Sequence, residues 1–225
     1  MKLKSFGCSF IAGSELSDDG SSQIIGPNAS KLTWPALVAK ELGIEYSCWA
    51  LGGVGNLVIL NDMLYHTHNY NNELFVIGWT WIDRFDYFGN ELDQKTKRWK
   101  TIRPTSNDKT ASVYLRNMHS QSRDILASLI CMQSAIAVLQ RKNIPFIMTC
   151  IDDLVFKPHQ NLSQGVCELQ QYVQSFISTF EGTDFLSWSQ QHQYPISDNW
   201  HPLEEAHQAA AKIMLPLAQD LVYTK

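Results

Sequence analysis

Two apolar segments constrain the fold of this chain more than any other feature. Residues 74–79 read LFVIGW and residues 144–151 read IPFIMTCI. Neither segment alternates apolar with polar residues, as a strand with one face in water would. Both are therefore predicted to be strands that are buried on both faces, the kind found in parallel sheets covered by helices.

Segments with helical spacing alternate with further short apolar segments along the rest of the chain. Additional strands are predicted at 3–8, at 44–50 and at a short stretch over Asp184, Phe185 and Leu186. Helices are predicted at about 35–43, 56–68, 118–142, 163–180 and 201–224. This order predicts an α/β protein, a three-layer α/β/α sandwich around a flavodoxin-like parallel sheet of about five strands.

The length and composition favour one globular domain. The chain has 225 residues, of which 44% are hydrophobic and 18% charged, which is enough to bury a full core without disulfides or metals. Residues 85–117 are polar and irregular, with scattered aromatic side chains. We predict a single domain over 1–225, with an irregular insertion at about 85–117.

The charge pattern argues against a nucleic-acid partner. The net charge is −4, from 18 basic and 22 acidic residues, and a phosphate-binding surface would need a basic stripe. One local basic group precedes the helix predicted at 118–142, and we interpret it as a solvated loop face: Lys95, Lys97, Arg98, Lys100 and Arg103.

The five cysteines are odd in number and form no CxxC pair, so they predict free thiols in a reducing compartment.

The opening residues MKLKSFGCSF lack the apolar stretch of a signal peptide. No apolar run approaches 18 residues, so no membrane partner is expected. The expected location is cytoplasmic or virion-associated.

Polar residues follow several of the predicted strands. In parallel α/β sheets, ligands bind beyond the carboxyl ends of the strands. Four segments lie there, and a fifth precedes the last predicted helix: Gly7–Ser9, Gly52–Asn56, Gly78–Thr80, Ile151–Asp153 and Asp198–Pro202.

Asp198 and His201 are spaced to share one site. A histidine with a pKa near 6.5 can take a hydroxyl proton and return it to a leaving group, and a carboxylate can orient its ring. Asp198 could instead cap the last helix. A metal site formed by Asp198, His201 and His207 is disfavoured, because His207 would lie nearly two helical turns beyond His201. Taken alone, Ser9 is better explained as a turn or helix N-cap residue than as a nucleophile, since the GxSxG elbow is not matched.

Taken in order, these segments resemble the sequence blocks of the SGNH (GDSL-like) hydrolases, over almost the whole chain. Phe6–Gly13 resembles the first block, a strand followed by Gly-Asp-Ser and a later Gly, with Cys8 in place of the Asp. Ala50–Asn56 resembles the second block, with Gly53 as the best match to the glycine that donates its N–H to the oxyanion. Asp198–Pro202 matches the Asp-x-x-His-Pro of the fifth block.

The third block departs from the family pattern Gly-x-Asn-Asp. The chain reads Gly78-Trp79-Thr80-Trp81, followed by Asp83 and Arg84, so that Thr80 stands where the oxyanion Asn is expected. Loss of such a donor typically costs roughly 10²–10³ in rate, and Asn56 or Arg84 could substitute. This variant also resembles SGNH-like proteins of bacteriophage genomes.

The resemblance implies a serine esterase that needs no metal or cofactor. Ser9 would be the nucleophile and His201 the general base, with Asp198 orienting His201. The backbone N–H groups of Ser9 and Gly53, with Thr80 or Asn56, would hold the oxyanion.

The substrate is expected to be a small-molecule or glycan ester. Trp79 and Trp200 are either core residues or aromatic faces for a sugar ring, the one hint of an O-acetylated carbohydrate. A catalytically weak SGNH-like binding or virion structural protein is the alternative, which the altered third block favours. A nucleotide site at GGVGN is disfavoured, since neither a Walker A motif nor GxGxxG is present.

Overall fold

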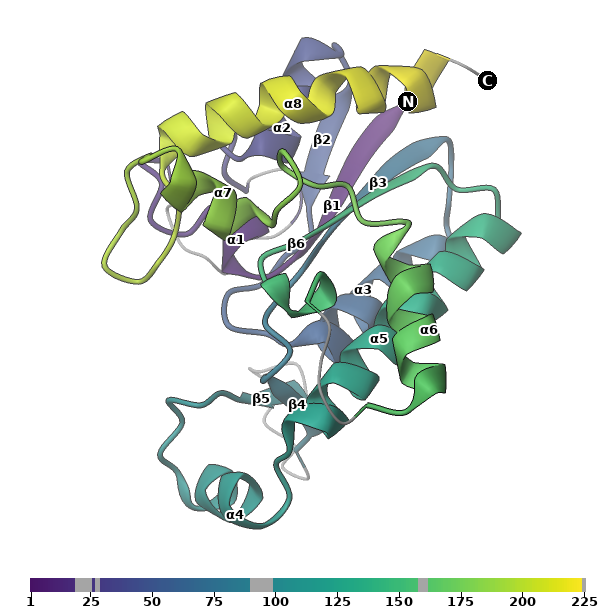
Figure 1. Cartoon of the computed structure of the whole chain (residues 1–225). Helices are drawn as coiled ribbons and strands as arrows, with labels where there is room; N and C mark the ends of the chain where they lie inside the picture. Colours follow the sequence, from purple (N-terminus) through teal and green to yellow (C-terminus); the bar gives the residue numbers. More distant parts are fainter. Residues whose placement is uncertain (19–25, 27–28, 90–98, 158–161, 224–225) are drawn as a thin grey trace.

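A computed structural model describes residues 1–18, 26, 29–89, 99–157 and 162–223 of the chain. Its centre is a sheet of four parallel strands in the order β2-β1-β3-β6 (Figure 1). The strands are β1 (Lys2–Gly7), β2 (Glu45–Cys48), β3 (Glu73–Trp79) and β6 (Phe146–Cys150). Since all four run in the same direction, their carboxyl ends meet at one edge of the sheet.

Helices cover both faces of this sheet, which confirms the predicted α/β/α sandwich. Figure 1 shows one layer above the sheet and one below it. The first layer holds α1 (Ser9–Ala12), α2 (Trp34–Glu41), α7 (Phe185–Gln191) and α8 (Glu204–Tyr223). The second layer holds α3 (Asn56–Thr67), α5 (Gln121–Arg141) and α6 (Gln164–Gln174).

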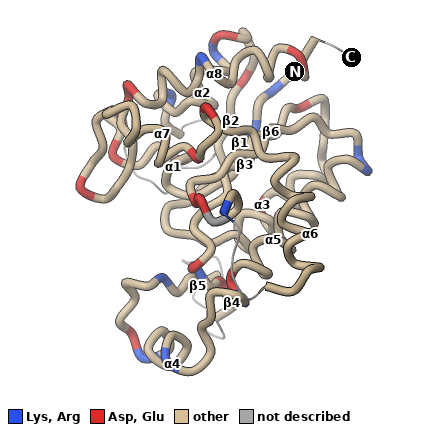
Figure 2. The backbone as a smooth tube through the Cα atoms, in the orientation of Figure 1, with Lys and Arg blue, Asp and Glu red and all other residues tan. Residues whose placement is uncertain are grey.

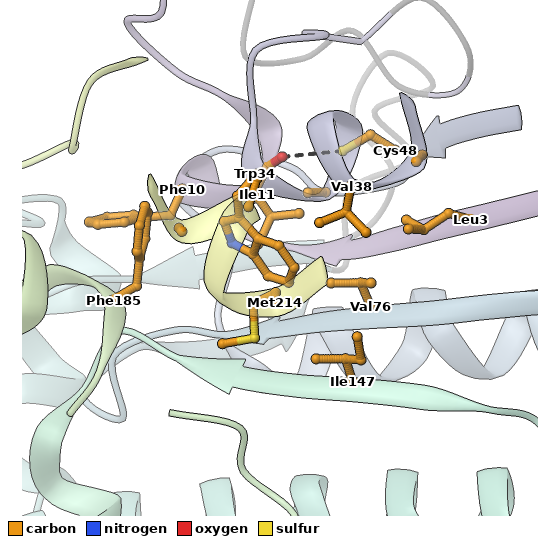
Figure 3. Packing of buried hydrophobic residues seen from close by; sticks show 14 of the residues in the cluster. Leu3, Phe10, Ile11, Trp34, Val38, Cys48, Val76, Ile147, Phe185 and Met214 are labelled. Carbon is orange, nitrogen blue, oxygen red and sulfur yellow. Dashed lines mark hydrogen bonds between the residues drawn. The ribbon is translucent and has the colours of Figure 1, made fainter. Parts of the chain in front are cut away.

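Strand β3 contacts both layers, as its apolar sequence predicts. All seven of its residues are buried. Leu74 and Val76 belong to the core on the α2 and α8 side, whereas Phe75 and Ile77 belong to the core on the α3 and α5 side. Figure 3 shows the first of these cores, in which Val76 lies near helix residues such as Met214.

The sheet of the described residues has four strands rather than about five. The stretch predicted as the last strand begins helix α7 instead, because the Asp184 carboxylate accepts the N–H groups of Leu186 and Ser187, both at 2.9 Å. Aspartate at this position is a strong helix N-cap. On the other side of β6 from β3, the described residues form a single bridge, between Met148 and Ile177.

The long helix predicted at 118–142 is α5, preceded by the separate helix α4 (Lys109–Asn117). By length and composition, α5 could cross a membrane, but half of its most apolar window is buried within the protein. Two polar residues, Asp124 and Ser128, lie on its buried side. These features are those of a core helix packed against a sheet.

The predicted insertion contains regular structure of its own. Strands β4 (Phe85–Phe88) and β5 (Trp99–Ile102) pair antiparallel, and Ile102 packs with α4. Asp86 joins this unit to the start of α3, since its carboxylate accepts hydrogen bonds from the N–H groups of Gly55, Leu57 and Val58 and from the Thr101 hydroxyl.

Charged residues of both signs are interspersed along the described chain (Figure 2). Of the basic group near the insertion, Lys95, Lys97 and Arg98 lie outside the described residues. All five cysteines are free thiols, and four of them are buried. A short 3₁₀ turn, η1 (Asp153–Val155), follows β6 at the carboxyl edge.

Candidate active site

Ser9 is held at the carboxyl end of β1 by the close approach of α1 to the sheet. Gly7 and Gly78 are opposite each other in the β1–β3 register. A Cβ added at Gly78 would lie 2.4 Å from Cγ1 of Ile11, and one added at Gly7 would lie 2.6 Å from the same atom. Glycine at both positions therefore lets α1 rest on the end of the sheet, with Ser9 at its first position.

His201 reaches Ser9 from a turn that precedes α8. The turn is closed by three hydrogen bonds. The N–H of Ser197 donates to the His201 carbonyl at 2.9 Å, the N–H of Trp200 donates to the Ser197 carbonyl at 3.0 Å, and the N–H of His201 donates to Ser197 Oγ at 3.1 Å. The ring packs edge-on against Phe10 at a centroid distance of 5.1 Å. Its Nε2 lies 2.9 Å from Ser9 Oγ, within reach for proton transfer.

The carboxylate on the other side of the ring belongs to Glu15. Its Oε2 lies 2.5 Å from His201 Nδ1 and accepts the Ser197 hydroxyl at 2.5 Å, while Oε1 accepts the Asn199 amide at 2.6 Å. The hydrogen bond from Ser197, followed by those from His201 and Asn199, lowers the pKa of Glu15 to about 2. The carboxylate is thus ionised at neutral pH.

This geometry corrects the role predicted for Asp198. Its side chain is exposed at the corner of the turn, and among the described residues it makes no hydrogen bond or ion pair with His201. The turn itself explains the difference, because Ser197 and Asn199 on either side of Asp198 both bind Glu15. Asp198 does not cap the last helix either, since α8 begins at Glu204.

Ser9, His201 and Glu15 line a pocket of about 640 Å³. Its remaining lining residues are Ser14, Gly52, Gly53, Trp81, Asp83, Arg84, Arg103, Pro104, Thr105 and Asn199. Gly53 has a φ of 79°, in the left-handed region that glycine adopts without strain. The N–H of Ser9 is among the first of α1, which have no acceptor within the helix. Both Ser9 and Gly53 line the pocket.

Thr80 and Asn56 bind each other instead of lining this pocket. Thr80 is fully buried. Its N–H donates to Asn56 Oδ1 at 2.9 Å, and Asn56 Nδ2 donates to the Thr80 carbonyl at 3.2 Å and to Ser128 Oγ at 3.1 Å. The amide that was predicted as an oxyanion donor is thus used to join α3 to the end of β3.

The predicted aromatic residues also lie elsewhere. Trp79 is fully buried in the core, and Trp200 is 59% exposed outside the pocket lining. The pocket tryptophan is Trp81, which packs edge-on against Phe10 at 5.3 Å. The Arg84 guanidinium lies 4.8 Å from the Trp81 ring centroid and donates to the Val54 carbonyl at 2.8 Å, so Arg84 does belong to the site.

Nine pocket residues were not among the predicted site residues: Ser14, Glu15, Gly52, Trp81, Asp83, Arg103, Pro104, Thr105 and Asn199. The sequence gives a weak indication of two of them: Arg103 belongs to the local basic group, and Trp81 lies at the third block. For Glu15 and Asn199 it gives no indication beyond their proximity to Ser9 and His201.

His207 is separate from this site. It is buried, its Nδ1 accepts the Trp34 N–H at 3.1 Å, and burial lowers its pKa to about 3. Within the described ranges, His, Cys, Asp and Glu side chains form no group that could hold a metal ion.

Comparisons by sequence find no relative: no protein-family model matches the chain, and no curated protein does. Solved structures do match. One is a lipolytic protein of the G-D-S-L family from Veillonella parvula, with 14% identity and a TM-score of 0.52 over 100% of this chain and 99% of the other.

Two esterases are also similar in structure. A carbohydrate esterase family 2 enzyme from Corynascus thermopiles matches with 14% identity and a TM-score of 0.53, over 98% of this chain and 66% of the other. The esterase EstA from Pseudoalteromonas matches with 11% identity and a TM-score of 0.50, over 97% of each chain. At these identities the likeness is one of fold. It confirms at that level the resemblance seen in the sequence blocks: the chain has the fold of the G-D-S-L, or SGNH, hydrolases.

Proposed function

We propose that this protein is a serine esterase that hydrolyses a carboxylic ester through Ser9. The observation that carries the proposal is a continuous line of contacts in one pocket. Ser9 Oγ lies 2.9 Å from His201 Nε2, and Nδ1 of the same ring lies 2.5 Å from Glu15. A nucleophile, its base and a carboxylate that orients the base are the parts that acyl transfer needs.

The first half of the reaction forms an acyl-enzyme. His201 Nε2 accepts the Ser9 proton while Oγ attacks the ester carbonyl carbon. Glu15 holds the proton on Nδ1 and stabilises the imidazolium. In this proposal the N–H groups of Ser9 and Gly53 stabilise the oxyanion. When the tetrahedral intermediate collapses, His201 gives its proton to the departing alcohol.

The second half repeats these steps with water. His201 takes a proton from a water molecule, whose oxygen attacks the acyl carbon of the Ser9 ester. The intermediate collapses, the C–O bond to Ser9 breaks, and His201 returns the proton to Oγ. The products are a carboxylic acid and the free enzyme, so no cofactor enters the balance.

A fluorophosphonate probe tests this proposal directly, because it reacts with serines that an adjacent base activates. EstA, one of the structural neighbours, is described as inhibited by monoethylphosphonate. We expect labelling at Ser9, located by mass spectrometry of the labelled peptide, and its loss in Ser9→Ala. Ser14→Ala is the matched control, since Ser14 lines the same pocket but its hydroxyl has no hydrogen-bond partner among the described residues.

Binding without turnover is the second candidate function. The burial of Thr80 favours it, because Thr80 then offers the pocket no hydroxyl donor in place of the family's Asn. Absence of both labelling and short-chain ester hydrolysis in folded protein would refute the esterase and leave this alternative.

A further inference from the structure

Two guanidinium groups line the pocket beside the nucleophile, and neither is needed for the proton transfers. Arg84 is fixed by the Val54 carbonyl and by the face of Trp81. Arg103 follows strand β5 of the insertion and has an exposed side chain. Both line the same pocket as Ser9 and His201. A substrate bound for attack by Ser9 would therefore lie close to positive charge.

Arg103 lies against the glycine loop of the site. Its Nη1 is 3.3 Å from the point where a Cβ of Gly53 would stand, so the absence of a side chain there makes room for the guanidinium. Across the described part of the chain, this guanidinium makes no hydrogen bond or ion pair. A planar group with five donors, left without a partner in a pocket, is suited to bind a ligand.

The acidic residues of the pocket do not offset this charge. Glu15 is occupied by His201, Ser197 and Asn199. Asp83, the other acidic lining residue, is half-buried; burial raises its pKa, and the charge of the adjacent Arg84 opposes that rise. Glu15 is thus paired with His201 and Asp83 with Arg84, which leaves Arg103 as the pocket cation without an acidic partner in the pocket lining.

We propose that Arg103, with Arg84 in the same pocket, forms a subsite for an anionic oxygen group of the substrate. The inference rests on the proposed esterase function and narrows it to esters whose acyl or alcohol part carries a carboxylate, sulfate or phosphate. A guanidinium binds such groups through two parallel N–H···O bonds. Partial exclusion of water by the pocket makes the preference larger than that of a surface ion pair, about tenfold to a hundredfold in kcat/KM.

Matched pairs of esters test the proposal. On the alcohol side, 4-acetoxybenzoate is compared with the uncharged 4-acetoxybenzamide. On the acyl side, mono-4-nitrophenyl adipate is compared with 4-nitrophenyl hexanoate. In at least one pair we expect the charged ester to have the higher kcat/KM, and Arg103→Gln to lower the charged-to-neutral ratio at least tenfold. Arg141→Gln is the control, since Arg141 is exposed at the end of α5 that leads to the start of β6, at the opposite edge of the sheet.

The outcomes separate this inference from the esterase proposal. A charged-to-neutral ratio of kcat/KM that Arg103→Gln leaves unchanged in both pairs would overturn the subsite. This includes the case in which kcat/KM falls equally for both members of a pair, which would assign Arg103 to the transition state of every ester. If no ester is hydrolysed, calorimetric titration with 4-hydroxybenzoate and 4-hydroxybenzamide decides: Arg103-dependent binding of the carboxylate alone supports the subsite, and no binding refutes it.

Discussion

Replacing Glu15 with glutamine is expected to lower kcat for a short-chain ester by about 10²–10³-fold, while Asp198→Asn changes it by less than about threefold. Both substitutions replace a carboxylate by an amide of the same shape. They differ because Glu15 lies 2.5 Å from His201 Nδ1, whereas Asp198 is exposed at the turn corner.

The expected magnitude follows from the tautomer that Glu15 enforces. A carboxylate can only accept, so Nδ1 must carry the ring proton and Nε2 is free to accept the proton of Ser9. A glutamine can donate its own N–H to Nδ1, which places the ring proton on Nε2, the wrong nitrogen. Such a change at a buried acid costs about 10⁴ in kcat. The Glu15 side chain is 34% exposed, and screening by water reduces the expected loss.

The assay is steady-state hydrolysis of 4-nitrophenyl acetate at pH 8, together with the rate of fluorophosphonate labelling, which isolates attack by Ser9. Circular dichroism and thermal unfolding establish that each variant is folded. The reasoning is refuted if Asp198→Asn loses as much activity as Glu15→Gln. Equal, full activity of both variants would show that His201 works without an acid.

Three further substitutions test the surroundings of the site. Asn56→Ala leaves the buried backbone groups of Thr80 unpaired and is expected to lower the free energy of unfolding in urea by about 2–3 kcal/mol. Gly53→Ala forces a side chain onto a φ of 79° next to a guanidinium, so kcat/KM is expected to fall about tenfold and Tm by a few degrees. His207 has its pKa lowered to about 3 when folded, against 6.5 when unfolded. The unfolded chain therefore binds the proton first, and stability is lost as pH falls from 6.5 toward 3. Urea unfolding at pH 7.5 and pH 5 is expected to differ by about 2 kcal/mol from this group, a difference that His207→Gln removes.

The sequence predicts the layers of the fold well, because burial on both faces leaves a direct pattern. The run LFVIGW has no polar position, and β3 is buried at every residue. The strand predicted over Asp184, Phe185 and Leu186 is wrong, since these residues begin helix α7. Asp184 accepts two N–H groups of the following turn, and a helix cap of this kind outweighs the preference of two apolar residues for a strand.

For the site, the sequence predicts residues fixed by the main elements and misses those fixed by loop contacts. Ser9 and Gly53 follow strands, and His201 lies three residues before the last helix, so their meeting follows from the order of elements. Thr80 and Asn56 also follow or begin elements, but their polar groups pair with each other. The direction of the Asn56 side chain, away from the pocket, depends on its hydrogen bond to Ser128 in α5. Ser128 lies far along the chain, so no local sequence pattern predicts this contact.

The position of Glu15 shows why an acid outside the histidine turn can serve this site. An acid at Asp198 could orient His201, but it belongs to the same turn and could not attach that turn to the rest of the protein. Glu15 lies six residues after Ser9 and binds Ser197, Asn199 and His201 at once. One carboxylate therefore sets both the tautomer of His201 and the distance of the whole turn from Ser9. The two roles separate in Glu15→Gln, because the amide can still hold the turn through its carbonyl oxygen while it loses control of the ring proton. If the turn remains in place, KM for a short ester should stay near its original value while kcat falls.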